Sequence, residues 1–285
     1  ITKNLEGLLG KAQKLEAEGI SAYILAGGYH QDRLSITGSP MKDIVFLDKI
    51  IGTGEIAISE NRAIEPNAEQ LKKIISESYV GGLLGEKSGV TVIHLGSGKK
   101  QCTMIDRILF EIEIPPSKIV ITHVNRNRSI LKEALYLNKQ GINIDITAGM
   151  KPNLIKDTVK PSEAIKWLID NGADLERITM SSDGYAGRSL FDEHGNLRGF
   201  QRNKVEFLTE EINDLIKKEN VNISEALKVI TSNPSIIYHL NNKGEISIGK
   251  DADLLVLNND FIIDKVIAKG KIMVDGGEVV VNEIF

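Results

Sequence analysis

Four side chains that can bind a metal ion or move a proton lie in, or directly after, four different apolar runs of the sequence. They are Glu55, His94, His123 and Asp183. Imidazole nitrogens and carboxylate oxygens are ligands that suit zinc, and a zinc-bound water has a pKa close to neutrality. An unpaired carboxylate inside an apolar run is costly, so Glu55 in particular requires a cation. If the four runs belong to one sheet, the sequence predicts a metal site that can activate water.

Each of these residues taken alone has a simpler explanation. A histidine at a strand end is more often a hydrogen-bonded structural residue. The pair Asp183-Gly184 is also a common turn sequence. The metal hypothesis therefore depends on the four residues occurring together, on separate strands whose ends can converge.

Strand-like apolar runs alternate with amphipathic segments over the first two thirds of the chain. The six expected strands are Ser21–Ala26, Ile50–Ile56, Val90–His94, Lys118–His123, Ile142–Thr147 and Ile178–Ser182. The helices expected between them are Leu5–Glu18, Ala68–Tyr79, Cys102–Glu113, Ile130–Lys139 and Ser162–Asn171. This alternation predicts βαβ units and a parallel sheet. A doubly wound sheet can have six strands, but polar residues at several strand ends favour a (β/α)8 barrel, whose active sites lie there.

The pattern changes in the last third of the chain. Two helical segments, Lys204–Lys218 and Ile223–Leu240, come first, and we expect an interruption at Asn233–Pro234. Short β runs follow from Gly244 onward, with a hairpin turn at Gly276–Gly277. We therefore expect a barrel domain over residues 1–243, incomplete at its N-terminus, and the C-terminal part of a small β-sandwich over residues 244–285.

The composition limits the classes of partner. The net charge of the 285-residue chain is −4, so no basic surplus indicates binding to nucleic acid or an anionic membrane. No apolar run approaches the roughly 18 residues of a membrane span. The single cysteine, Cys102, excludes an internal disulfide framework and favours a cytoplasmic location.

Three motifs carry a resemblance to a known family. They are Val92-Ile93-His94-Leu95-Gly96, Thr122-His123-Val124-Asn125-Arg126-Asn127 and Ser181-Ser182-Asp183-Gly184. In sequence and spacing they resemble the isoaspartyl (β-aspartyl) dipeptidases of the amidohydrolase superfamily. The element Gly249-Lys250-Asp251-Ala252-Asp253-Leu254 is typical of the superfamily more broadly. The resemblance implies a metal-dependent TIM-like barrel that hydrolyses β-aspartyl dipeptides.

The resemblance also implies roles in the reaction. His94 and His123 would bind zinc, and the full-length protein would hold two zinc ions. Asp183 would be a zinc ligand and the general base that takes a proton from a metal-bridging hydroxide. Tyr29 would polarise the scissile carbonyl and bind substrate. Glu55 takes the position of a carboxylated lysine in relatives, and its carboxylate would bridge the metals without requiring CO2.

Substrate contacts are implied as well. Arg62 and Arg126 would bind substrate carboxylates, which match the planar guanidinium fork. A serine that contacts substrate in relatives aligns with Gly187, and Ser189 is the nearest substitute. By the same resemblance we expect a cytoplasmic homo-oligomer that binds a small dipeptide.

One feature of the superfamily is missing from this sequence, namely a His-X-His pair on the first barrel strand. The chain begins at Ile1, and we expect strands one and two to lie upstream of it. Two alternatives stay open. One is a cyclic-amide hydrolase of the dihydroorotase or hydantoinase kind, which shares the metal set. The other is a non-catalytic barrel remnant. The motifs Gly27-Gly28-Tyr29-His30 and Thr122–Asn127 favour the dipeptidase.

Overall fold

The protein is described by a computed structural model that covers residues 4–29, 35–60, 63–155, 157–191, 194 and 196–281. Its internal contacts divide the chain into two units. The first comprises residues 1–57, 62–93 and 234–285, and the second comprises residues 58–61 and 94–233.

Six parallel strands form one sheet in the order β1 to β6. They are β1 (Ile24–Ala26), β2 (Ile50–Ile58), β3 (Val90–Leu95), β4 (Ile119–Thr122), β5 (Asn143–Thr147) and β6 (Ile178–Ser181). Every residue of β3, β4 and β5 is buried, as expected of parallel strands that are covered on both faces. All six predicted strands are therefore confirmed. The first is shorter than predicted because its pairing begins at Ile24, whose N–H donates to the carbonyl oxygen of Lys49 at 2.8 Å.

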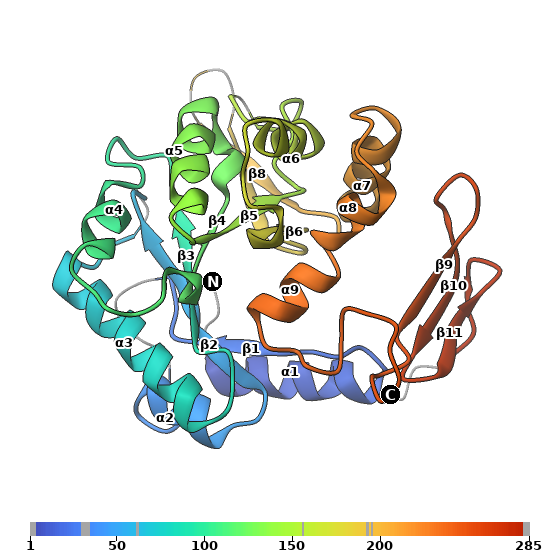
Figure 1. Ribbon diagram of the computed structural model, residues 1–285, viewed down its shortest axis with the longest axis horizontal. Coiled ribbons are helices and arrows are strands. Elements are labelled where there is room, and N and C mark those ends of the chain that lie inside the picture. The colour runs from blue at the N-terminus through green and yellow to red at the C-terminus, as the bar shows by residue number, and fades with distance from the viewer. Residues whose placement is uncertain are drawn as a thin grey trace. The chain divides into compact units, whose positions relative to one another are not determined.

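One helix precedes these strands, and further helices connect them. They are α1 (Leu5–Ala17), α2 (Pro40–Phe46), α3 (Ala68–Leu84), α4 (Thr103–Leu109), α5 (Arg128–Lys139) and α6 (Pro161–Asp170), with short 3-10 turns η1 (Pro116–Lys118), η2 (Val124–Arg126) and η3 (Leu175–Arg177). Asn67 and Gln70 form a reciprocal capping box that starts α3. Helix α2, which packs beside α3 (Figure 1), was not predicted. Its start could have been recognised from the cap Ser39 followed by Pro40.

Two elements after β6 differ from the prediction. Strands β7 (Gly187–Phe191) and β8 (Leu197–Arg202) form an antiparallel hairpin that the sequence analysis missed. The helical region then contains α7 (Phe207–Lys217), α8 (Ile223–Lys228) and α9 (Ser232–Ile237). The interruption precedes Asn233, which is the second residue of α9. Its side-chain amide donates to the carbonyl oxygens of Leu175 and Ile178 at 2.7 and 2.8 Å.

The C-terminal strands form a separate antiparallel sheet (Figure 1). They are β9 (Leu254–Leu257), β10 (Ile263–Ala268), β11 (Lys271–Asp275) and β12 (Glu278–Val279), in the order β12-β11-β10-β9. Gly276 and Gly277 join β11 to β12 with φ angles of 59° and 80°. Two consecutive positive φ values are what a tight hairpin turn needs, so the predicted turn is confirmed. Among the helices that the structure describes, none is long and apolar enough to cross a membrane.

Candidate metal centre

Glu55 projects from β2, where the backbone before it is tightly constrained. A Cβ atom at Gly54 would lie 2.7 Å from the carbonyl oxygen of Val92, closer than a real side chain allows. Gly54 also has a φ of 152°, which L-residues rarely adopt. Glycine is therefore required immediately before Glu55, and the side chain of Glu55 itself is half-buried.

His94 is buried in β3, and one nitrogen of its ring contacts two charged side chains. Nη2 of Arg126 lies 3.0 Å from Nε2 of His94, and Oε2 of Glu60 lies 3.4 Å from the same nitrogen. The side chains of His94 and Glu60 are only 8% and 4% exposed. Close packing fixes Glu60, since a Cβ atom at Gly96 would lie 2.7 Å from its Cα. A carboxylate and a guanidinium therefore set the orientation of the His94 ring.

His123 directly follows β4 and has left-handed backbone angles, with a φ of 68°. Its Nδ1 lies 2.7 Å from Oγ1 of Thr147. The adjoining turn is held by Asn125, whose Oδ1 accepts from the backbone N–H of Thr147 at 3.0 Å. Nδ2 of Asn125 donates to the carbonyl oxygens of Thr147, Met150 and Val159 at 3.2–3.3 Å. These bonds satisfy buried polar groups and keep the strained turn in place.

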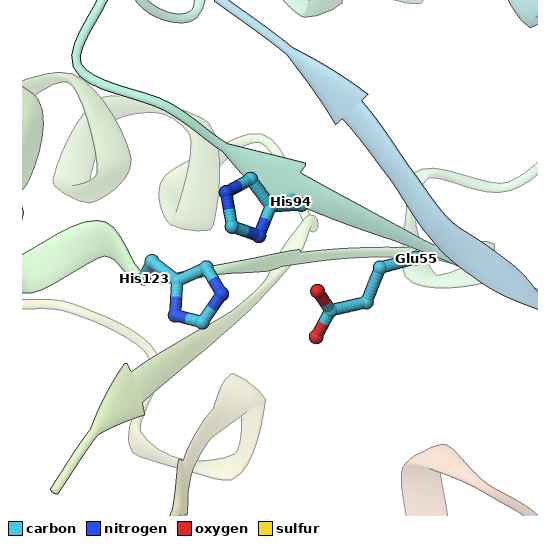
Figure 2. Close-up of side chains that lie close together, drawn as sticks. All are labelled: Glu55, His94 and His123. Carbon is cyan, nitrogen blue, oxygen red and sulfur yellow. The ribbon is translucent and has the colours of Figure 1, made fainter. Parts of the chain in front are cut away.

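Glu55, His94 and His123 come together as one group of potential ligands (Figure 2). One ligand atom from each residue lies within 4.8 Å of the others. The two imidazole rings are edge to face, with centroids 4.4 Å apart and planes at 71°. Two imidazoles and a carboxylate are a donor set that zinc and related divalent metals prefer. The side chains present therefore fit the metal that the sequence predicts.

Asp183, the fourth predicted ligand, directly follows β6 and has a φ of 49°. Its Oδ2 accepts a hydrogen bond from Nδ2 of Asn203 at 3.1 Å. Among the described residues, the potential ligand group consists of Glu55, His94 and His123, without Asp183. The position of Asp183 at a strand end matches the prediction, but its metal contact stays a prediction.

Of the four residues predicted to contact substrate, the structure describes the side chains of Tyr29 and Arg126. Tyr29 is half-buried, and its backbone carbonyl accepts from the N–H of Ala57 at 3.4 Å. Arg126 lies beside a predicted ligand, as described above. Arg62 falls outside the described residues, and Ser189 lies in β7 with a side chain that is also outside them. The substrate roles of all four residues stay predictions.

Some residues at the site were missed by the sequence analysis. Glu60 contacts His94, and Asn203 contacts Asp183. Neither Glu60 nor Asn203 stands out in the sequence. Asp145 is a buried carboxylate inside β5. The argument applied to Glu55, that a carboxylate within an apolar run needs partners, would have identified Asp145 as well. Burial raises the pKa of Asp145, and hydrogen bonds from neighbouring hydroxyl groups oppose this rise.

Comparison with known proteins shows the family of this chain. Residues 116–273 match the amidohydrolase family. A crystal structure of a β-aspartyl dipeptidase from Fervidobacterium islandicum AW-1, in complex with the β-Asp-Leu dipeptide, is 36% identical to this chain. The two superpose with a TM-score of 0.91 over 100% of this chain and 73% of the dipeptidase. The chain belongs to the amidohydrolase family.

Two further proteins are similar to this chain, one over its whole length and one over a short segment. A second structure of the β-aspartyl dipeptidase from Fervidobacterium islandicum AW-1 is 34% identical, with a TM-score of 0.88 over 100% of this chain and 72% of that one. An allantoinase from Enterococcus faecalis is 37% identical over 69 residues, which are 24% of this chain. The chain spans only 14% of the length of that curated relative.

The fold and the family resemblance predicted from the sequence are therefore confirmed. The parallel sheet belongs to an amidohydrolase barrel of the TIM type, and the separate antiparallel sheet is the small β-sandwich portion. The resemblance to isoaspartyl dipeptidases, first based on the motifs around His94, His123 and Asp183, extends over the whole chain.

Proposed function

We propose that this amidohydrolase cleaves β-aspartyl dipeptides at a divalent metal site containing Glu55, His94 and His123. One observation carries the proposal. The three side chains offer ligand atoms within 4.8 Å of one another in a chain that superposes along its whole length on a β-aspartyl dipeptidase. The fold alone would not suffice, because one fold supports many reactions.

The metal assignment follows from the donor atoms. Glu55, His94 and His123 would hold zinc, with Asp183 as a further ligand, and the full-length protein would contain two ions. A bound metal of this kind polarises the scissile carbonyl and lowers the pKa of water. The carboxylate of Glu55 would bridge the two ions in place of a carboxylated lysine.

The chain's own residues would supply the remaining chemistry. Asp183 would accept the proton of the attacking water and return it to the leaving amine, as a general base and then a general acid. Tyr29 would donate a hydrogen bond to the oxygen on which negative charge develops. Arg126 and Arg62 would bind the substrate carboxylates, because the guanidinium fork matches a carboxylate in geometry and charge. Ser189 would add a polar contact to the dipeptide.

Several broader properties belong to the same proposal. The barrel would occupy residues 1–243 and the small β-sandwich portion residues 244–285. The protein would act in the cytoplasm as a homo-oligomer on a small dipeptide, without binding nucleic acid or membranes. The net charge of −4 supports the absence of nucleic acid and of anionic membranes among the partners.

The direct test is turnover by zinc-loaded full-length protein. We expect hydrolysis of β-Asp-Leu and none of dihydroorotate. The opposite result would favour a cyclic-amide hydrolase, for which the short match to an allantoinase is the supporting observation. A natively purified protein that holds no metal and cleaves neither compound would favour the non-catalytic barrel.

A matched pair of variants links activity to the metal site. His123→Asn should abolish turnover and reduce the bound zinc measured by atomic emission. His194→Asn makes the same substitution at an exposed position, and we expect it to leave both quantities unchanged. Equal zinc content in the two variants would remove His123 from the ligand set.

A further inference from the structure

Strand β5 provides none of the proposed metal ligands, yet its side chains contact the strands on both sides of it. Thr147, its last residue, places Oγ1 2.7 Å from Nδ1 of His123. Thr147 is fully buried, and His123 is 3% exposed. The hydrogen bonds of Asn125 to the N–H and carbonyl groups of Thr147 fix the backbone that carries this hydroxyl. The hydroxyl is therefore held rigidly against the ring.

Asp145 lies two residues before Thr147 and so on the same face of β5. Its carboxylate joins β4 to β6 through hydroxyl groups. Oδ2 accepts from Oγ1 of Thr122 at 2.8 Å and from Oγ of Ser181 at 2.7 Å. Oδ1 accepts from Oγ1 of Thr179 at 2.7 Å. Asp145 is only 6% exposed, so water competes little for these hydrogen bonds.

The partners of Asp145 lie next to proposed catalytic groups. Thr122 immediately precedes His123, and Ser181 stands two residues before Asp183. A single buried carboxylate therefore ties together the strand ends that present these two residues. A hydrogen bond to Nδ1 fixes the rotation of the His123 ring and directs its Nε2 away from Thr147. Partners of this kind orient histidine ligands and tune their affinity for metals.

We infer that Thr147 and Asp145 are positioning residues of the metal site. Thr147 orients the His123 ring through Nδ1, and Asp145 sets the spacing of the ends of β4 and β6. Neither residue needs to touch metal or substrate. The inference rests on the proposed function, since it assumes that His123 binds a metal.

The first test compares two substitutions at Thr147 in the full-length protein. Thr147→Val keeps the shape but removes the hydroxyl, and we expect zinc affinity to fall by about 10- to 100-fold. Thr147→Ser keeps the hydroxyl and should bind zinc within about threefold of the unmodified protein. Affinity is measured by chelator competition, and the visible spectrum of the Co²⁺-loaded protein reports ligand geometry. The spectrum should change in the valine variant and be restored in the serine variant.

A matched control removes a buried hydroxyl elsewhere. Thr91 is buried in β3, and no hydrogen-bond partner of its Oγ1 exists within the described part of the chain. Thr91→Val should leave zinc affinity and the Co²⁺ spectrum unchanged. Melting temperatures of the metal-free proteins separate loss of folding from loss of ligand orientation. If the control loses as much affinity as Thr147→Val, the inference is wrong.

The second test is Asp145→Asn, which is nearly isosteric and removes one strong acceptor. We expect zinc affinity to fall by about 10-fold even if Thr147→Val does not fold. Wild-type affinity in Asp145→Asn, or equal losses in Thr147→Ser and Thr147→Val, would overturn the inference. If the unmodified protein binds no zinc, the proposed function itself is wrong. If the unmodified protein binds zinc but the variants keep its affinity, only the positioning roles of Thr147 and Asp145 are wrong.

Discussion

Nη2 of Arg126 lies 3.0 Å from Nε2 of His94, so a guanidinium proposed to bind substrate packs directly against a proposed metal ligand. The Nε–H of Arg126 also donates to the backbone carbonyl of Leu95. These two contacts anchor one edge of the planar group beside the site. An anchored guanidinium loses little freedom on binding, which favours bidentate recognition of a carboxylate.

The first prediction concerns Arg126→Lys. Lysine keeps the positive charge but cannot reproduce the planar fork or the bond to Leu95. We expect KM for β-Asp-Leu to rise by about 10-fold or more, because a lost charge-assisted hydrogen bond costs about 1.5–3 kcal/mol. Zinc affinity should change by less than about threefold. Steady-state kinetics and zinc titration measure the two effects.

Arg107→Lys is the control for this substitution, since the side chain of Arg107 in α4 is 66% exposed and its Nε pairs with Glu111, two residues beyond the end of that helix. Its KM should equal that of the unmodified protein. An Arg126→Lys variant that loses zinc but keeps its KM would show that Arg126 serves the metal site and not the substrate.

The second prediction concerns Asp183→Asn. The substitution preserves shape but removes the proposed proton acceptor, so kcat should fall by about 10²- to 10⁴-fold. The melting temperature should shift little, because the amide can still contact Asn203. Asp260→Asn, at an exposed turn position, is expected to retain full activity. Near-normal kcat for Asp183→Asn would exclude this residue as the general base.

The third prediction concerns CO2. A glutamate at position 55 is already a carboxylate, so activity should be the same in bicarbonate-free buffer and in buffer with added bicarbonate. In Glu55→Lys, a carboxylate can form only by reaction with CO2, so any activity should increase with bicarbonate. Glu55→Gln cannot form one and should bind less metal under both conditions. Bicarbonate-independent activity of Glu55→Lys would argue against a bridging role for this position.

The fourth prediction concerns acid stability. Glu16 in α1 forms ion pairs with Lys269, at 2.6 Å, and with Lys49. These contacts lower the pKa of Glu16 from 4.5 to about 2, and the hydrogen bond from Lys269 contributes most. Because the folded-state pKa is depressed, this stabilisation is complete above the unfolded-state pKa and is lost as the pH falls toward 2.

Glu16→Gln should therefore lower the free energy of unfolding by about 1 kcal/mol at pH 7, and the deficit should shrink below about pH 4.5. Urea unfolding at several pH values measures the difference. Glu6→Gln, at an exposed position of the same helix, is the control. A deficit that stays constant down to pH 2 would contradict an electrostatic origin.

The sequence by itself determined the parallel sheet and the main candidate ligands. Fully buried strands appear as continuous apolar runs, so β3, β4 and β5 could be located from composition alone. Polar residues at the ends of such runs must lie near one edge of the sheet. This reasoning found His94 and His123, and the cost of burying a carboxylate inside an apolar run found Glu55, without any knowledge of the contacts between them.

Only the tertiary structure decided which other side chains meet these residues. Glu60 lies near His94 because glycine at position 96 allows a close approach of two backbones. Asp145 gathers hydroxyl groups from both neighbouring strands. Such contacts depend on the register between strands and on turns with positive φ. Local sequence patterns encode the period of a strand but not which residues of its neighbours stand opposite, so these partners could not be derived from the sequence.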